Sequence, residues 1–169
     1  MFCTCVRYSL VYELEPDAKA RVRILIAEDN LMNQKVITKI LHTIGFRSTV
    51  ASNGKEAFDK YVEEAEAGRP FDLVLMDLQM PVMDGFMATR SIFEYVAGKV
   101  AEGEGEWAEG LFLRPRVVAV TADVMQSVIQ ECKSCKVHGF ISKPIRREKL
   151  VGIMEEVATW VAEVKPSPS

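Results

Sequence analysis

The 169-residue sequence predicts an α/β domain built on a five-stranded parallel sheet with helices on both faces. Two observations lead to this prediction, the order of the segments and the composition. Short apolar runs of strand length alternate with longer segments whose apolar residues recur at helical spacing, and the unit repeats five times. Apolar residues make up 49% of the chain and charged residues 27%, which suits one folded core and argues against disorder.

The apolar runs are taken as strands and the striped segments as helices. In the first helix the stripe falls at residues 37, 40, 41 and 44, and Gly45 ends it, as glycine does just past a helix end. The expected strands span 22–27, 46–51, 71–76, 116–120 and 137–142. The expected helices span 31–44, 55–67, about 84–96, 122–135 and a last segment striped from 150 to 164.

Other stretches do not fit the alternation. Val6 to Tyr12 alternates apolar and less apolar residues, which indicates a short strand, and Glu13 to Arg21 indicates a polar linker broken by Pro16. Scattered glycine and glutamate indicate a mobile acidic loop before the fourth strand. The expected organisation is an extension (1–21), one domain (22–164) that contains this insertion (98–115), and a frayed tail (165–169).

Composition excludes several classes of function. The net charge of −3 gives no basic field for nucleic acid, and no apolar run approaches the roughly 20 residues of a membrane span. The first residues lack the pattern of a secretion signal.

Cys132 and Cys135 could be redox-active or bind metal, but no second such pair completes a zinc site. A reduced, structural role is favoured, and with it an intracellular, cytoplasmic location.

Polar side chains follow four of the five expected strands. Glu28 and Asp29 end the first, Asp77 the third, Thr121 the fourth and Lys143 the fifth. In a parallel sheet these strand ends share one edge, where ligands bind. Three clustered carboxylates repel one another unless a cation lies among them, and Mg²⁺ prefers oxygen ligands together with a phosphate. The sequence therefore predicts a Mg²⁺ site that a phosphoryl group completes, with Asp77 as the acceptor nucleophile. Thr121 and Lys143 would bind the phosphoryl oxygens.

Four motifs lie at these strand ends. They are Ile24–Asn30 with Asn33, Met76–Gly85, Val118–Ala122 and Gly139–Pro144. Together they resemble the receiver domain of response regulators in two-component phosphorelays, over roughly residues 22–164. The amino-acid sequences of the first two motifs are most similar to those of receivers of hybrid histidine kinases in multistep relays.

The resemblance implies a flavodoxin-like three-layer sandwich with strand order 2-1-3-4-5. It also implies that Asp77 is phosphorylated from a histidine with Mg²⁺ as cofactor. Asp29 would bind Mg²⁺ directly and Glu28 largely through water. Gln79 would offer its backbone carbonyl.

The resemblance implies that the remaining motif residues bind the phosphoryl group or change conformation when it is present. Thr121, Ala122 and Lys143 would bind the phosphoryl group and report its presence. Phe140 would be the aromatic residue whose rotamer follows phosphorylation. The Lys143–Pro144 peptide bond would be cis, because proline lowers the free energy of the cis form relative to trans. The insertion at 98–115 departs from the family pattern next to the usual signalling face.

The expected partner is a histidine phosphotransfer protein or a histidine kinase, with no nucleic acid and no membrane insertion. Leu31, Met32 and Val36 lie off the core stripe of the first helix and could form an apolar dock. Equally, they could widen that stripe.

Alternative functions fit the sequence less well. A phosphatase of the haloacid-dehalogenase type needs a second aspartate where this chain has Gln79, which cannot transfer a proton. A docking module without phosphorylation is disfavoured by the intact acidic residues. No phosphate-binding Gly-x-x-x-x-Gly-Lys loop and no ATP-binding region are present, so we expect a phosphoacceptor and not a stand-alone enzyme.

Overall fold

The computed structural model describes residues 16–102, 114–122 and 125–164. Its five strands form one parallel sheet in the order β2-β1-β3-β4-β5, as predicted. The strands are β1 (Ile24–Ala27), β2 (Ser48–Ala51), β3 (Leu73–Asp77), β4 (Arg116–Thr121) and β5 (Gly139–Ser142). The helices are α2 (Pro16–Arg21), α3 (Leu31–Thr43), α4 (Gly54–Glu66), α5 (Gly85–Glu102), α6 (Gln126–Ser134) and α7 (Arg147–Val164).

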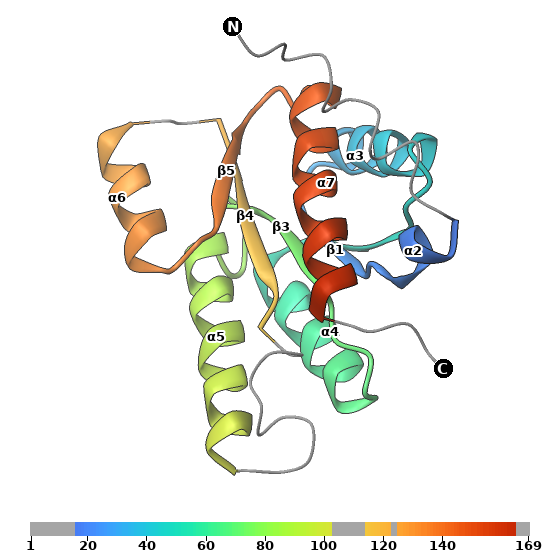
Figure 1. The fold of residues 1–169 in the computed structure, drawn as a ribbon. Coiled ribbons are helices and arrows are strands. Elements are labelled where there is room, and N and C mark those ends of the chain that lie inside the picture. Colours follow the sequence, from blue (N-terminus) through green and yellow to red (C-terminus); the bar gives the residue numbers. More distant parts are fainter. Residues whose placement is uncertain (1–15, 103–113, 123–124, 165–169) are drawn as a thin grey trace, which may run out of the picture.

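The sheet lies between two helical layers, with α3 and α7 on one face and α4 and α5 on the other (Figure 1). Successive side chains of a strand alternate between these layers. Ile24 and Ile26 of β1 pack with α3 and α7, whereas Leu25 packs with α4 and α5. A smaller apolar cluster joins Ala119 of β4 to Cys132 of α6. Every residue of β1 and β3 is buried, as expected for central strands covered on both faces.

Polar side chains begin the helices directly after the strand-end residues. The Asn30 side chain accepts hydrogen bonds from the Met32 and Asn33 amides at the start of α3. The Asn53 and Asp84 side chains accept comparable bonds at the starts of α4 and α5. Such caps satisfy amides that have no partner within the helix. They also fix the loops that carry the candidate site.

The largest differences from the predicted boundaries are in three helices. Residues 16–21, expected to be linker, form α2, because Pro16 occupies the first turn, where a missing amide costs nothing. Helix α5 continues to Glu102, since its last turn is supported by ion pairs of Lys99 with Glu66 and Glu102 at 2.9 and 3.7 Å. Helix α6 begins only at Gln126, after an extended Met125. The strand expected at 6–12 and most of the expected acidic loop lie outside the described residues.

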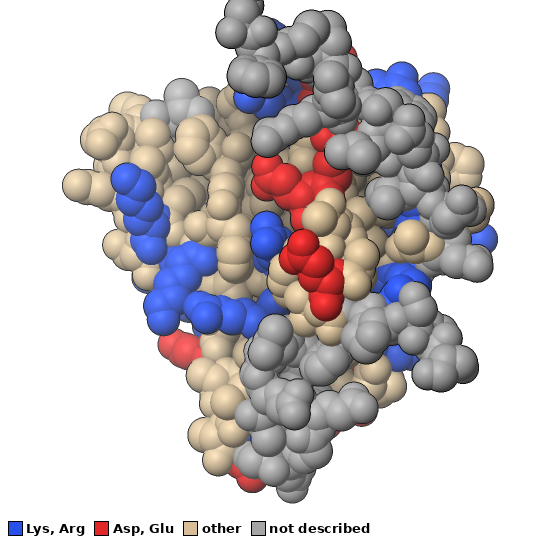
Figure 2. All heavy atoms as spheres, viewed as in Figure 1, with Lys and Arg blue, Asp and Glu red and all other residues tan. Residues whose placement is uncertain are grey.

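Charged side chains of both signs lie on the side of the molecule that α7 covers. Figure 2 shows this side, with acidic side chains over α7 and basic ones over α6 and the adjoining part of α5. The mixed pattern agrees with the net charge of −3. None of the helices within the described residues is both long and apolar enough to cross a membrane.

Candidate functional site

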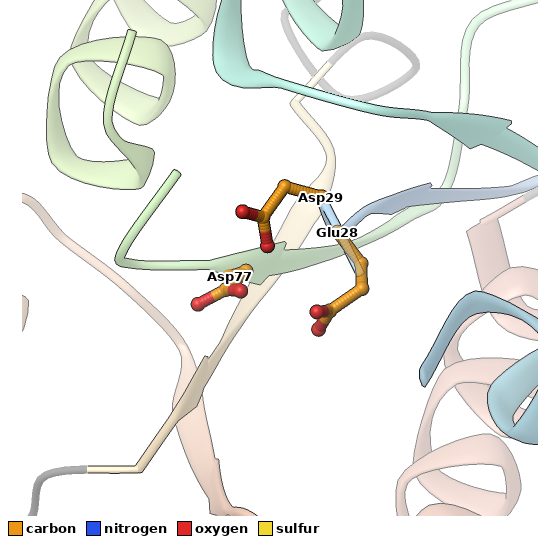
Figure 3. Close-up of side chains that lie close together, drawn as sticks. All are labelled: Glu28, Asp29 and Asp77. Carbon is orange, nitrogen blue, oxygen red and sulfur yellow. The ribbon is translucent and has the colours of Figure 1, made fainter. Parts of the chain in front are cut away.

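Three carboxylates meet at the carboxyl edge of the sheet. Glu28 and Asp29 follow β1 directly, and Asp77 is the last residue of β3, the strand beside β1. Carboxylate oxygens of the three residues lie within 4.8 Å of one another (Figure 3). Glu28 and Asp77 are 1% and 2% exposed, whereas Asp29 is open to solvent. The acidic pocket is therefore closed on the side of the protein and open on one side to an incoming ligand.

Lys143, which directly follows the edge strand β5, supplies a positive charge to this pocket. Its Nζ atom lies 2.6 Å from Asp77 Oδ2 and 2.9 Å from Glu28 Oε2. The Lys143 amide donates to the Thr121 carbonyl at 2.8 Å, which continues the pairing of β4 with β5. The Lys143–Pro144 peptide bond is cis. One ammonium group is thus shared between two buried carboxylates.

Burial dominates the electrostatics of Asp77. Burial raises its pKa, and the charge of Glu28 adds to this effect. Hydrogen bonds from Lys143 and from the Gln79 amide act in the opposite direction but do not offset the burial. For Lys143, burial lowers the pKa, but the close contacts with the two carboxylates prevail and raise it. The lysine therefore stays charged beside the three acidic side chains.

The side chains present fit a magnesium ion. All three acidic residues offer oxygen ligands, which Mg²⁺ prefers, and the exposed Asp29 leaves room for the waters that it retains. Glu28 Oε2 is buried and, among the described residues, accepts no hydrogen bond of normal geometry, although the Lys143 ammonium is close. A cation in this pocket would satisfy that oxygen and offset the repulsion.

The other predicted residues lie in or just after strands of the same sheet. The Gln79 amide donates to Asp77 Oδ1 at 3.0 Å, which places the backbone of residue 79 beside the carboxylate. Thr121 is the buried last residue of β4, and Ala122 follows it in an exposed position. Phe140 lies on β5 and is 49% exposed.

Sequence reasoning missed the residues that hold this site in place. Asn33 Nδ2 donates to Glu28 Oε1 at 2.9 Å, and Gln34 Nε2 donates to the Glu28 carbonyl at 2.6 Å. Gly85 packs against the backbone of Asp77 so closely that a Cβ atom would lie 2.1 Å from the Asp77 carbonyl oxygen. Asn33 and Gly85 both stand in the quoted motifs, which was the available signal, but only coordinates show what they contact.

Exposed apolar side chains lie on the segments that follow β1, β3 and β4. Leu31, Met32 and Val36 of α3 are 66%, 67% and 46% exposed, so they do not widen the core stripe. Val82, in the loop after β3, is 84% exposed, and Met125, after β4, is 62% exposed. We refer to these five residues as the apolar rim. Only the three on α3 were predicted from the sequence.

Comparisons with known proteins agree with this geometry. Residues 24–100 match the response regulator receiver domain. This chain contains a receiver domain of the two-component phosphorelay type. It is 37% identical over 136 residues to the osmosensing histidine protein kinase SLN1 of Saccharomyces cerevisiae, covering 80% of this chain and 10% of that protein. It is 35% identical over 147 residues to hybrid signal transduction histidine kinase A of Dictyostelium discoideum, covering 87% and 6%. The chain thus spans about a tenth or less of these relatives.

Solved structures of receivers share the fold. A CheX–CheY–BeF3–Mg complex from Borrelia burgdorferi aligns with a TM-score of 0.68 at 24% identity, over 86% of this chain and 96% of that one. A co-crystal structure of the Saccharomyces cerevisiae histidine phosphotransfer protein Ypd1 with the receiver domain of its downstream response regulator Ssk1 aligns with a TM-score of 0.66 at 23% identity. That alignment covers 86% of this chain and 93% of the other. These likenesses show the receiver fold.

Proposed function

We propose that Asp77 accepts a phosphoryl group from a phosphohistidine of a partner protein. The observation that carries the proposal is the buried Asp77 carboxylate beside two further carboxylates and 2.6 Å from the Lys143 ammonium. An Asp77 oxygen forms the new bond to phosphorus while the bond from phosphorus to the histidine nitrogen breaks. In such a transfer negative charge spreads over the phosphoryl oxygens, so catalysis consists of positioning and electrostatic stabilisation.

Each neighbouring residue has a role in this proposal. Glu28, Asp29, Asp77 and the Gln79 carbonyl would hold Mg²⁺, which would supply positive charge to the phosphoryl oxygens. Lys143 exchanges part of its contact with Asp77 for a phosphoryl oxygen. The Thr121 hydroxyl donates a hydrogen bond to a second phosphoryl oxygen. The domain is then a phosphoacceptor and does not turn over a separate substrate.

The response leaves through a shift between two conformations. Thr121 moves towards the phosphoryl group, Ala122 follows with the loop, and Phe140 changes its rotamer on β5. Phe140 is half exposed, so its ring has room to change orientation. The same phosphoryl group can alternatively pass onward to a histidine of another protein.

The proposed partner is a histidine phosphotransfer protein or a histidine kinase that docks on the apolar rim. The rim lies on segments that follow β1, β3 and β4, and the ends of β1 and β3 also deliver the acidic pocket. A partner seated there would bring its phosphohistidine over Asp77. The free cysteines Cys132 and Cys135 agree with a reducing, cytoplasmic setting.

A direct transfer assay tests the proposal. Radiolabelled, phosphorylated Ypd1 is mixed with this chain in the presence of Mg²⁺, and the label is followed on a gel. We expect label to appear on the chain and not on an Asp77→Asn variant. We also expect Val36→Glu to slow this transfer while labelling by acetyl phosphate stays unchanged, because the substitution alters the dock and not the pocket. Equal labelling of the wild type and Asp77→Asn would refute the proposed acceptor.

A further inference from the structure

The two carboxylate oxygens of Glu28 have different surroundings. Oε1 accepts hydrogen bonds from Asn33 Nδ2 at 2.9 Å and from the Asn30 amide at 3.3 Å. Oε2 is buried, lies 2.9 Å from Lys143 Nζ and, within the described part of the chain, accepts no well-formed hydrogen bond. Among the residues that the structure describes, the hydrogen bonds of this carboxylate are therefore all on Oε1, whereas Oε2 has only the ion pair with Lys143 and can accept a further ligand.

The backbone that carries the Asn33 side chain is fixed at the start of α3. Asn33 is the third residue of α3, and its backbone amide donates to the Asn30 side chain at 3.2 Å. One residue further, Gln34 is buried and donates from its side chain to the Glu28 carbonyl at 2.6 Å. The first turn of α3 thus grips both the backbone and the carboxylate of Glu28, so Asn33 has little freedom to follow a carboxylate that turns away.

We infer that Asn33 is the positioning residue for the metal ligand Glu28. By holding Oε1, it keeps Oε2 directed into the acidic pocket and prevents the carboxylate from turning to give both oxygens to Lys143. A side chain that orients a metal ligand in this way contributes to metal affinity without touching the metal, and its loss weakens binding about 10- to 100-fold. The inference rests on the proposed Mg²⁺ site and adds a residue that the proposal did not use.

Calorimetric titration of the full 169-residue chain with magnesium chloride tests this role. Asn33→Leu removes the amide at nearly constant size on a partly exposed helical position. We expect the Kd for Mg²⁺ to rise about 10- to 100-fold, whereas the Tm in buffer containing a chelator changes little. Asn33→Ala removes the same amide with less added apolar surface, and it replaces the leucine variant if that chain does not fold.

Thr38→Leu is the matched control. It makes a similar exchange of a polar residue for leucine on the same helix, at a partly buried position for which no contact with Glu28 is seen. We expect its Mg²⁺ affinity to equal that of the wild type within about twofold. A loss of affinity that both variants share would mean that the effect comes from changes to the helix and would overturn the assignment of Asn33.

The outcomes separate this inference from the proposed function. If the wild type binds Mg²⁺ and Asn33→Leu binds it equally well, the positioning role is wrong and the phosphoacceptor site stands. If the wild type binds no Mg²⁺ at concentrations of several millimolar, the proposed metal site fails, and the inference fails with it. Labelling of Asp77 by acetyl phosphate in the wild type reports on the proposed function independently.

Discussion

Replacing Gly85 with alanine should damage both the stability and the chemistry of this protein. Gly85 is the first residue of α5, and its amide donates to the Leu78 carbonyl at 3.2 Å, just beyond Asp77. A Cβ atom there would lie 2.1 Å from the Asp77 carbonyl oxygen and 2.9 Å from its carbon. The atoms in the way belong to backbone, so they cannot rotate aside as the end of a side chain would.

The size of the effect follows from that distance. Contacts below 3.0 Å are essentially never seen for real Cβ atoms, so the backbone must move by about 1 Å. Overpacking of this kind costs about 1–3 kcal/mol, or a fall in Tm of roughly 2 to 12 °C for a chain of this size. A misplacement of about 1 Å at the reacting group can lower a rate about 100-fold. We therefore expect Gly85→Ala to have a lower Tm and about 100-fold slower labelling by acetyl phosphate.

Gly98 provides the control on the same helix. It is exposed, and a Cβ atom there would meet nothing within 4 Å. Gly98→Ala should therefore raise the stability by about 0.5–1 kcal/mol through better helix propensity and leave the labelling rate unchanged. Stability is measured by thermal unfolding in chelator, and labelling by mass spectrometry. A Gly85→Ala variant as stable and as quickly labelled as Gly98→Ala would show that the close approach of α5 to Asp77 does not exist.

Three further perturbations give separate tests. Asp77→Asn should raise the stability by about 1 kcal/mol in chelator at neutral pH. Burial raises the pKa of Asp77, so wild-type stability falls as the pH rises above 3.8, and urea titrations should show that the variant lacks this fall. His138 accepts a hydrogen bond from the Val117 amide at 3.1 Å, and partial desolvation of its ring together with the charges of Arg116 and Arg114 lowers its pKa. The unfolded chain therefore takes up the proton first, so thermal unfolding should show stability falling as the pH drops below 6.5, and less so in His138→Gln. Val82 has a φ of 69°, which strains a β-branched residue, so Val82→Asn should raise the stability by about 1 kcal/mol in urea unfolding.

Much of the fold could be predicted because its pattern is local. Alternating apolar runs and helical stripes identify the strands and helices, and a parallel sheet then brings every strand end to one edge. That reasoning places Glu28, Asp29 and Asp77 together without coordinates, and the structure brings them within 4.8 Å. The charge of Lys143 arrives at the same edge for the same reason.

What could not be predicted depends on contacts between distant segments. Gly98 reads as a helix breaker, yet α5 continues past it because Lys99 reaches Glu66 on the neighbouring helix. The exposure of Met32 depends on how deeply α3 sits on the sheet, which its own sequence does not state. The hydrogen bond of Asn33 to Glu28 needs the exact turn from β1 into α3, and no spacing rule describes it.

The most direct test of the account is the phosphorylation of Asp77 itself. The wild-type chain is incubated with acetyl phosphate and Mg²⁺, weighed intact, and then mapped to the modified residue after borohydride reduction of the aspartyl phosphate. The account predicts the gain of one phosphoryl group, located on Asp77, abolished by chelator and absent from Asp77→Asn. No gain in mass, or an equal gain in Asp77→Asn, would contradict it.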